Sequence, residues 1–355
     1  MMLRPSTLEQ LRAELARANS AGEQGLVFNL ETLNRVLEYA PEDMTVTVEA
    51  GVTLAALQAR LAQHGQWLPI DPPAPGPSSI ADIVNSDASG PRRFGYGTIR
   101  EHLLGIKVAM ADGRLIHSGG KVVKNVAGYD LCKLFVGSRG SLGVLVEATF
   151  KVRPLPEAER FVAARCESLD QTAALLEAVR GSPLAPVVLD LERVGTRQNS
   201  GTAVPAVPAG VPPALAFAGQ TPAPTDETPV PLIGHPAACS LILGLAGTRE
   251  AVDWQLNKAA ELGLSAPASL DYENGFWSAI QGGLVHHISV LPSRLTETLQ
   301  GLGATQFVTR AGNGVIYYRG GMAPPKADLP RALMQRIKDT YDPKHTLPDF
   351  PGVAG

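Results

Sequence analysis

Apolar positions recur at helical spacing near the start of the chain. Leu8, Leu11 and Leu15 lie three and four positions apart, on one side of a helix. Thr7 stands just before them and Gln10 three positions later, which is typical of a capped helix start. The pattern predicts a helix that ends at about residue 18.

A strand and a second helix give the next clear signals. Residues 45–49 alternate polar and apolar side chains as TVTVE and predict a strand. Thr53 is placed to cap a helix over residues 54–64, whose leucines share one side. Before them, residues 26–28 predict a short strand and residues 31–37 a turn or short helix.

Short helices and strands alternate along the rest of the chain. Helices are expected over residues 80–87, 168–180, 248–262 and 328–340. Strands are expected over residues 104–109, 114–118, 143–152, 161–166, 186–191, 240–245, 284–290 and 314–319. The prolines of LPIDPPAPGPSS exclude a helix or central strand and predict an extended ordered loop over residues 68–79.

Prolines also indicate a domain boundary. Residues 153–156 read RPLP, and prolines there cannot continue a strand ladder. The expected domains are residues 1–156, residues 157–330 and a C-terminal helix and tail over residues 331–355. A segment rich in Pro, Ala, Gly and Thr interrupts the second domain at about residues 195–236, where we expect a flexible surface insertion.

Composition narrows the function classes. The chain has 355 residues, of which 45% are hydrophobic, enough to bury more than one core. Its formal net charge of −3 offers no basic face for nucleic acid. Cys132, Cys166 and Cys239 are far apart, odd in number and without C-x-x-C spacing. They therefore suggest neither a disulfide framework nor a metal or iron–sulfur site, and fit a reducing cytoplasm.

The sequence also argues against direct membrane insertion. The N-terminal segment is polar and amphipathic, unlike a signal peptide, and no stretch reaches the roughly 20 apolar residues of a membrane span. Association with the inner face of a membrane would come through partners.

Glycines gather ahead of the strand predicted over residues 143–152. Gly137, Gly140 and Gly143 are spaced by three in GSRGSLGV. Glycine permits positive φ and lets the backbone approach a flat or phosphorylated ligand, so the spacing suits a nucleotide cofactor. An ordinary glycine turn is an equally weighted alternative. The motif is not the Rossmann fingerprint, because it precedes a strand instead of joining a strand to a helix.

A long stretch of the chain resembles a flavoprotein family. The segments that show the resemblance are KNVAGYDL at residues 124–131, GSRGSLGVLVEATFKVRP at 137–154 and SGPRRFGYGTIREHLLGIKVAMADGR at 89–114. A thinner match is MQRIKDTYDPKHTLP at residues 334–348. These segments resemble the E subunit of glycolate oxidase and, more broadly, the vanillyl-alcohol oxidase and D-lactate dehydrogenase relatives. The resemblance implies an α+β fold, with a two-subdomain PCMH-type FAD-binding domain followed by a mixed α/β cap domain.

The resemblance also implies which residues contact FAD. The family loop along the adenine and pyrophosphate is matched by Gly137, Ser138, Gly140, Leu142, Gly143 and Val144. Further matches, in the approach to the pyrophosphate and the turn toward the flavin, are Ser78, Ser79, Ser89, Gly90, Gly128 and Tyr129. For Tyr129, an ordinary buried aromatic is an equal alternative.

Two features depart from the family pattern. Its threonine-isoleucine-glycine-glycine reads Ser-Ile-Ala-Asp at residues 79–82, so a methyl group and a carboxylate replace two glycines beside phosphate. The glycine-rich loop after the first helix is reduced to AGEQG at residues 21–25. These departures imply that FAD is bound weakly or has been lost. No histidine in either loop suggests covalent attachment, so non-covalent FAD is expected. Glycines at Ala81 and Asp82 are expected to strengthen binding.

If FAD is bound, the resemblance implies hydride removal from the α-carbon of a 2-hydroxy acid to the flavin. The sequence identifies neither the base nor the carboxylate-binding cation. His286, His287, Arg310 and Arg319 are candidates on the cap, although paired histidines in a strand point to opposite faces and ordinary structural roles are favoured. Arg92 and Arg93 are equally consistent with ordinary surface charges and with contacts to a partner subunit.

Three hypotheses follow. The first is a flavin-binding subunit of a glycolate-oxidase-like complex, in the cytoplasm, with a catalytic flavin subunit and an iron–sulfur subunit as partners. The second is a non-catalytic structural subunit of that complex. The third is a stand-alone FAD-dependent hydroxy-acid dehydrogenase, disfavoured because the usual catalytic motifs of such caps are not apparent.

Overall fold

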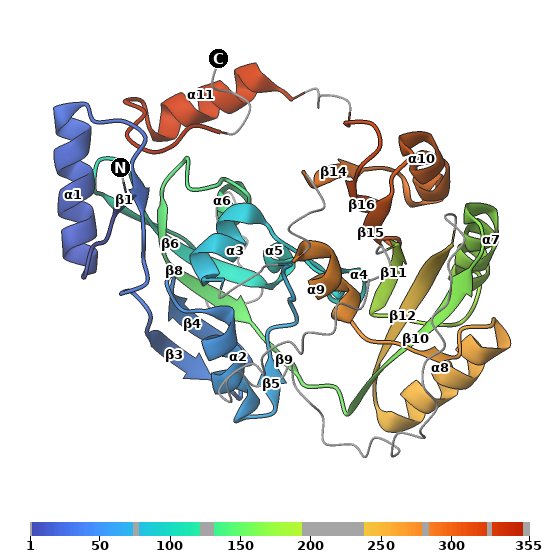
Figure 1. The fold of residues 1–355 in the computed structure, drawn as a ribbon. Helices are drawn as coiled ribbons and strands as arrows, with labels where there is room; N and C mark the ends of the chain where they lie inside the picture. Colours follow the sequence, from blue (N-terminus) through green and yellow to red (C-terminus); the bar gives the residue numbers. More distant parts are fainter. Residues whose placement is uncertain are drawn as a thin grey trace, which may run out of the picture. The chain divides into compact units, whose positions relative to one another are not determined.

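The computed structural model describes residues 2–73, 78–120, 131–193, 238–278, 284–324 and 329–350. The chain divides into two compact units (Figure 1). The first unit comprises residues 1–90, 97–155 and 326–355, and the second comprises residues 91–96 and 156–325. The insertion expected at about residues 195–236 lies outside the described residues, as do Gly128 and Tyr129.

An antiparallel five-stranded sheet forms the centre of the first unit, in the order β3-β4-β8-β6-β7. Its strands are β3 (Val36–Ala40), β4 (Thr45–Glu49), β6 (Leu103–Ala109), β7 (Leu115–Gly119) and β8 (Val144–Lys151). The middle strand β8 pairs with β4 on one side and β6 on the other. Its apolar residues lie in the core because neighbours cover both of its edges and helices pack against it.

Six helices and two small strand pairs complete the first unit. The helices are α1 (Leu8–Ala21), α2 (Leu54–Ala62), α3 (Ile80–Ser86), α5 (Ile99–His102), α6 (Cys132–Phe135) and α11 (Arg331–Tyr341). The pairs are β1 (Met2–Leu3) with β2 (Val27–Phe28), and β5 (Gln66–Trp67) with β9 (Arg153–Pro154). The capping predictions are confirmed, since the Thr7 and Thr53 hydroxyls accept hydrogen bonds from the first turns of α1 and α2.

A seven-stranded antiparallel sheet forms the second unit, in the order β13-β10-β12-β11-β15-β16-β14. Its strands are β10 (Ala158–Cys166), β11 (Val188–Arg193), β12 (Cys239–Gly247), β13 (Ala266–Pro267), β14 (His286–Ser289), β15 (Gln306–Arg310) and β16 (Val315–Arg319). Its helices are α4 (Arg93–Tyr96), α7 (Leu169–Arg180), α8 (Arg249–Glu261), α9 (Asp271–Trp277), the 3₁₀ turn η1 (Pro292–Arg294) and α10 (Leu295–Leu302).

The two faces of this sheet differ in chemistry. Helices α7, α8 and α10 pack on an apolar face that includes Leu189 and Tyr318 (Figure 1). Because side chains alternate along a strand, the next positions point the other way. Asp190, Arg310, Tyr317 and His287 therefore share the opposite face, here called the polar face, where α9 and α4 contact the sheet.

Several elements differ from the sequence prediction. Residues 31–37 hold a turn only at 31–32, and the strand β3 begins at Val36. Helices α9 and α10 and strand β15 were not predicted. The elements read from hydroxyl caps and strict alternation, such as α2 and β4, are confirmed with their starts unchanged.

A buried lysine joins three segments of the first unit. The ammonium of Lys338, on α11, is 1% exposed and pairs with Asp342 at 2.7 Å. It also donates to the carbonyls of Ser141, Leu347 and Pro348 at 2.9–3.0 Å. The C-terminal segment and the glycine-rich loop are thus held by one charge.

Replacing Lys338 with Met is expected to destabilise the protein by about 3–5 kcal/mol, because Asp342 would remain buried without its cation. Urea denaturation followed by circular dichroism measures the loss. Lys258→Met is the control, since Lys258 forms an exposed pair with Glu261 on α8 and should cost under about 1 kcal/mol. Equal effects of the two substitutions would contradict this interpretation.

Candidate functional site

The glycine-rich loop runs from α6 into β8. Gly137, Arg139 and Gly140 have φ values of +78°, +54° and +74°. At the two glycines a Cβ atom would meet nothing closer than 3.7 Å, so the need for glycine there is conformational. The N–H groups of Gly137 and Arg139 donate to the carbonyls of Val84 and Asn85, which fixes the loop on the end of α3.

Several polar groups of this loop have no partner. The N–H groups of Gly140, Leu142 and Gly143 donate to no acceptor among the described residues. The hydroxyl oxygen of Ser138 is buried, and it too has no hydrogen-bond partner in the described part of the chain. Buried polar groups are normally satisfied, so this cluster is suited to an acceptor-rich ligand such as a phosphate.

The neighbouring predicted residues contribute through packing. Leu142 and Val144 are buried, with their side chains in the hydrophobic core of the first unit. A Cβ atom at Gly143 would lie 2.4 Å from Val108, so only glycine fits beside β6. These three positions set the path of the backbone into β8.

Ser79 and its neighbours form a helix cap. The Ser79 hydroxyl accepts from Asp82 N–H at 3.1 Å, and the Asp82 carboxylate accepts from Ser79 N–H and Oγ. The N–H groups of Ile80 and Ala81 donate to the carbonyls of Val52 and Ala50. The first turn of α3 therefore has no N–H group left for phosphate.

Ser78, Ser89 and Gly90 shape the backbone near α3. The Ser78 carbonyl accepts from Leu54 N–H at the start of α2. Ser89 is buried and donates to the Asp87 carbonyl. A Cβ atom at Gly90 would lie 1.7 Å from the Asp71 carbonyl oxygen, so glycine is required for this close approach.

The shortened loop after α1 is closed by the C-terminal segment. Gly22 ends α1 at φ +70°, and Glu23 N–H donates back to Ala18. Gly25 and Leu26 donate to the carbonyls of His345 and Thr346. Backbone donors at this second predicted phosphate position are therefore engaged within the chain.

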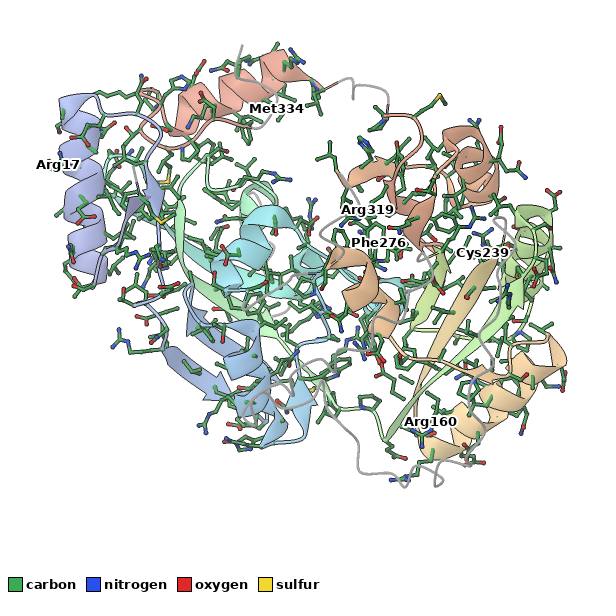
Figure 2. The ribbon with its side chains drawn as sticks, in the orientation of Figure 1. Arg17, Arg160, Cys239, Phe276, Arg319 and Met334 are labelled. Carbon is green, nitrogen blue, oxygen red and sulfur yellow. The ribbon has the colours of Figure 1, made fainter. Side chains whose placement is uncertain are left out.

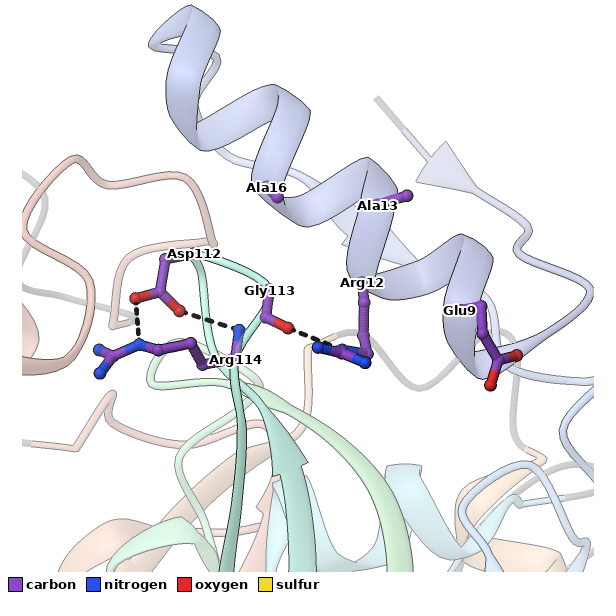
Figure 3. A pocket seen from close by; sticks show the side chains of 7 residues that line it. All are labelled: Glu9, Arg12, Ala13, Ala16, Asp112, Gly113 and Arg114. Carbon is purple, nitrogen blue, oxygen red and sulfur yellow. Dashed lines mark hydrogen bonds and ion pairs between the residues drawn. The ribbon is translucent and has the colours of Figure 1, made fainter.

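A cavity of about 360 Å³ lies between α1 and the turn that joins β6 to β7 (Figure 3). Arg12 donates to the Gly113 carbonyl, and Arg114 pairs with Asp112. With Glu9 also lining it, the cavity has two cations and two carboxylates. None of the predicted site residues lines it.

The polar face of the second unit holds a buried ionic cluster. Arg310 pairs with Asp190 at 2.6 Å and donates to both oxygens of Glu273, at 2.7 and 2.9 Å. Tyr272 donates to Asp190, and Trp277 to Glu273. Burial raises the pKa of Asp190 to about 6, because desolvation outweighs the attraction of Arg310. This arrangement joins Asp190 to residues more than 80 positions away in the sequence, and the sequence did not predict it.

The paired histidines point to opposite faces, as predicted. His287 stacks on Tyr317 with ring centroids 5.1 Å apart, and His286 lies 5.2 Å from the ring of Tyr318. Arg319 donates to the Phe276 carbonyl and lies over its ring at 5.3 Å (Figure 2). Arg310 and Arg319 are thus engaged in holding α9 to the sheet.

Neither a metal-binding cluster nor a membrane-spanning helix is found among the described residues. Within the described ranges, no group of three or more His, Cys, Asp or Glu side chains is arranged to hold a metal ion. The described helices include none that is long and apolar enough to cross a membrane.

Residues 4–119 match the family model of the FAD binding domain. The chain is 36% identical over 168 residues to glycolate oxidase subunit GlcD of Bacillus subtilis and 40% identical over 124 residues to glycolate oxidase subunit GlcE of Escherichia coli. It is 38% identical over 172 residues to a probable mitochondrial D-lactate dehydrogenase of Danio rerio.

These matches cover 47%, 35% and 46% of this chain and 36%, 35% and 33% of the relatives. The alignments therefore span about a third of the length of the curated relatives. Among solved structures, alkyldihydroxyacetonephosphate synthase has a similar fold, with a TM-score of 0.66, 15% identity and coverage of 98% of this chain and 76% of that chain. The predicted fold class, an α+β FAD-binding domain with a further α/β part, is confirmed, and FAD is the cofactor that these matches support.

Substituting glycine at both Ala81 and Asp82 is expected to lower stability by about 2 kcal/mol, through loss of the Asp82 carboxylate from the capping box and added glycine flexibility. Urea denaturation measures this change, with Ala59→Gly in α2 as the control for glycine alone. FAD affinity, followed by flavin fluorescence, is expected not to rise, because the Ala81 N–H is held by Ala50. A clear gain in affinity would mean that these amides do reach the phosphate.

Asp190→Asn is expected to change how stability depends on pH. The pKa of Asp190 lies at about 6 in the folded protein against 3.8 when unperturbed, so its stabilising effect is present below pH 4 and lost as the pH rises through 6. The wild type should thus lose on the order of 3 kcal/mol relative to the variant between pH 4 and 7. Denaturant titrations across this range measure the difference, and parallel curves would contradict the assignment.

Proposed function

We propose that this chain binds FAD non-covalently and acts in the oxidation of a 2-hydroxy acid, as the FAD-binding subunit of a glycolate-oxidase-like complex. The family match and the relatives support the cofactor and the oxidoreductase class. Two of those relatives are named as subunits, which supports a role within a complex.

The unsatisfied groups of the glycine-rich loop carry the proposal. Three N–H groups, at Gly140, Leu142 and Gly143, and the Ser138 hydroxyl have no partner among the described residues. A diphosphate offers the acceptor oxygens that such donors require. The residues present therefore fit FAD at this loop, while Lys338 holds the loop in place through the Ser141 carbonyl.

The proposed roles of the remaining residues follow from this fit. Gly137 and Gly140 allow the turn that presents the donors, and Ser78, Ser79, Ser89 and Gly90 hold the backbone beside it. Gly128 and Tyr129, outside the described residues, remain predicted contacts. Bound FAD supplies the hydride acceptor for the oxidation.

A second candidate is a non-catalytic subunit with an eroded flavin site. The N–H groups at the start of α3 and in the loop after α1 are engaged by carbonyls and side chains of the chain itself. Those donors are therefore withdrawn from a diphosphate. Flavin affinity decides between this candidate and the first.

The complex would supply what this chain does not carry. Cys132, Cys166 and Cys239 are buried thiols, of which Cys166 and Cys239 lie opposite each other on β10 and β12. We infer that iron–sulfur centres would belong to a partner subunit, beside a catalytic flavin subunit. We place the complex in the cytoplasm, peripheral to the membrane through those partners. A stand-alone hydroxy-acid dehydrogenase is the remaining alternative.

Purified full-length chain is expected to show flavin absorbance bands, either as isolated or after FAD is added, with saturable binding by fluorescence titration. Ser138→Ala should weaken FAD binding about fivefold or more, as loss of a hydrogen bond to a charged group predicts. Ser86→Ala is the matched control, because its hydroxyl bonds only to carbonyls within α3.

Three outcomes separate the hypotheses. Absence of FAD binding rejects the proposal and the stand-alone dehydrogenase and favours the structural subunit. Bleaching of bound flavin by glycolate in the isolated chain rejects the structural subunit. Flavin that binds but is reduced only when partner subunits are added supports the FAD-binding subunit of a complex.

A further inference from the structure

Three side chains on the polar face of the second unit have unused hydrogen-bonding groups. They are Arg93 of α4, His287 of β14 and Tyr317 of β16, and none has a hydrogen-bond or ion-pair partner among the described residues. His287 and Tyr317 face each other across two paired strands, with their rings stacked at 5.1 Å. Burial lowers the pKa of His287, and the charge of Arg93 acts in the same direction. Burial raises the pKa of Tyr317, and the charge of Arg93 opposes that rise, so the guanidinium lies near both side chains.

The position of Arg93 is fixed although its charge is unpaired. Gly95 N–H donates to the Val187 carbonyl, and the ring of Phe94 lies over Gly312, where a Cβ atom would be only 2.2 Å away. These contacts anchor α4 on the sheet. The Nε atom of Arg93 is buried and has no hydrogen-bond partner within the described ranges. A partly buried guanidinium without an ion-pair partner is suited to bind an anionic ligand.

Neighbouring arginines are used differently. Arg92 forms a two-pronged pair with Glu159, at 2.8 and 2.7 Å. Arg310 pairs with Asp190 and Glu273 through its two terminal nitrogens, and Arg319 donates to the Phe276 carbonyl. Of the described arginines on the polar face, Arg93 is thus the one whose charge is available.

We propose that Arg93, Tyr317 and His287 form a binding site for a small 2-hydroxy carboxylate. The Arg93 guanidinium and the Tyr317 hydroxyl donate to the carboxylate, and His287 accepts a hydrogen bond from the hydroxyl. His287 suits that role because burial and Arg93 lower its pKa and keep it neutral at pH 7. The hydroxy-acid class rests on the proposed function, whereas the anion site rests on the unpaired charge.

The site is tested by nuclear magnetic resonance on the full chain with labelled histidines, without added FAD. His287 is assigned by its loss in His287→Gln. Glycolate is expected to shift the His287 signals saturably and to raise the pKa of His287, because a bound carboxylate neutralises Arg93. Arg93→Met should weaken glycolate binding about tenfold or more, the loss expected for a hydrogen bond to a charged group.

Three controls test whether glycolate binding is specific to Arg93 and to the hydroxyl group of the ligand. Arg160 is exposed on β10 of the same unit (Figure 2), and Arg160→Met should leave glycolate binding unchanged. In the absence of glycolate, Arg93→Met should raise the pKa of His287, a change that reports charge proximity in a folded protein. Propionate, which lacks the hydroxyl, should bind several-fold more weakly than glycolate.

Defined results would overturn the inference. Failure of glycolate to shift His287, or equal effects of Arg93→Met and Arg160→Met, rejects the site. Equal binding of propionate, or of inorganic phosphate, rejects the 2-hydroxy acid as its ligand. Because FAD is not added, failure of FAD binding would reject the proposed function while leaving this site standing.

Discussion

One buried charge organises the first unit. The ammonium of Lys338 satisfies Asp342 and three carbonyls, and those carbonyls belong to the glycine-rich loop and the C-terminal segment. Because neither Lys338 nor Asp342 can remain charged and unpaired in the core, these segments are held together or not at all. Asp342 in turn accepts from Thr346 and Leu347 N–H, so the C-terminal segment turns back at this point.

That constraint decides which backbone donors are free. The C-terminal segment supplies carbonyls to Gly25 and Leu26, and so closes the shortened loop after α1. The cap formed by Ser79 and Asp82 closes the start of α3. The glycine-rich loop alone, of the three predicted phosphate positions, keeps donors without acceptors among the described residues. At the two positions where family glycines are missing, the backbone N–H donors thus bond to oxygen atoms of the chain itself and not to an external anion.

Local signals predicted much of the fold but little of the second unit's chemistry. The hydroxyl caps at Thr7 and Thr53 could be predicted because each bonds within its own first turn. Strand β3 was missed because its apolar side chains are exposed at a sheet edge and do not alternate with polar ones. The ionic cluster depends on pairing β11 with β15, a register that spacing in the sequence does not carry.

Two arginines on the polar face of the second unit differ in their surroundings: Arg310 is paired with carboxylates, whereas Arg93 is not. Around Arg310 two carboxylates compete for one cation, which is why burial can raise the pKa of Asp190 to about 6. An additional carboxylate there would be repelled by Asp190 and Glu273. Near Arg93 lie the stacked rings of His287 and Tyr317, and Arg93 forms no ion pair with the residues that the structure describes. An anionic ligand is therefore directed toward Arg93, while Arg310 keeps α9 in position.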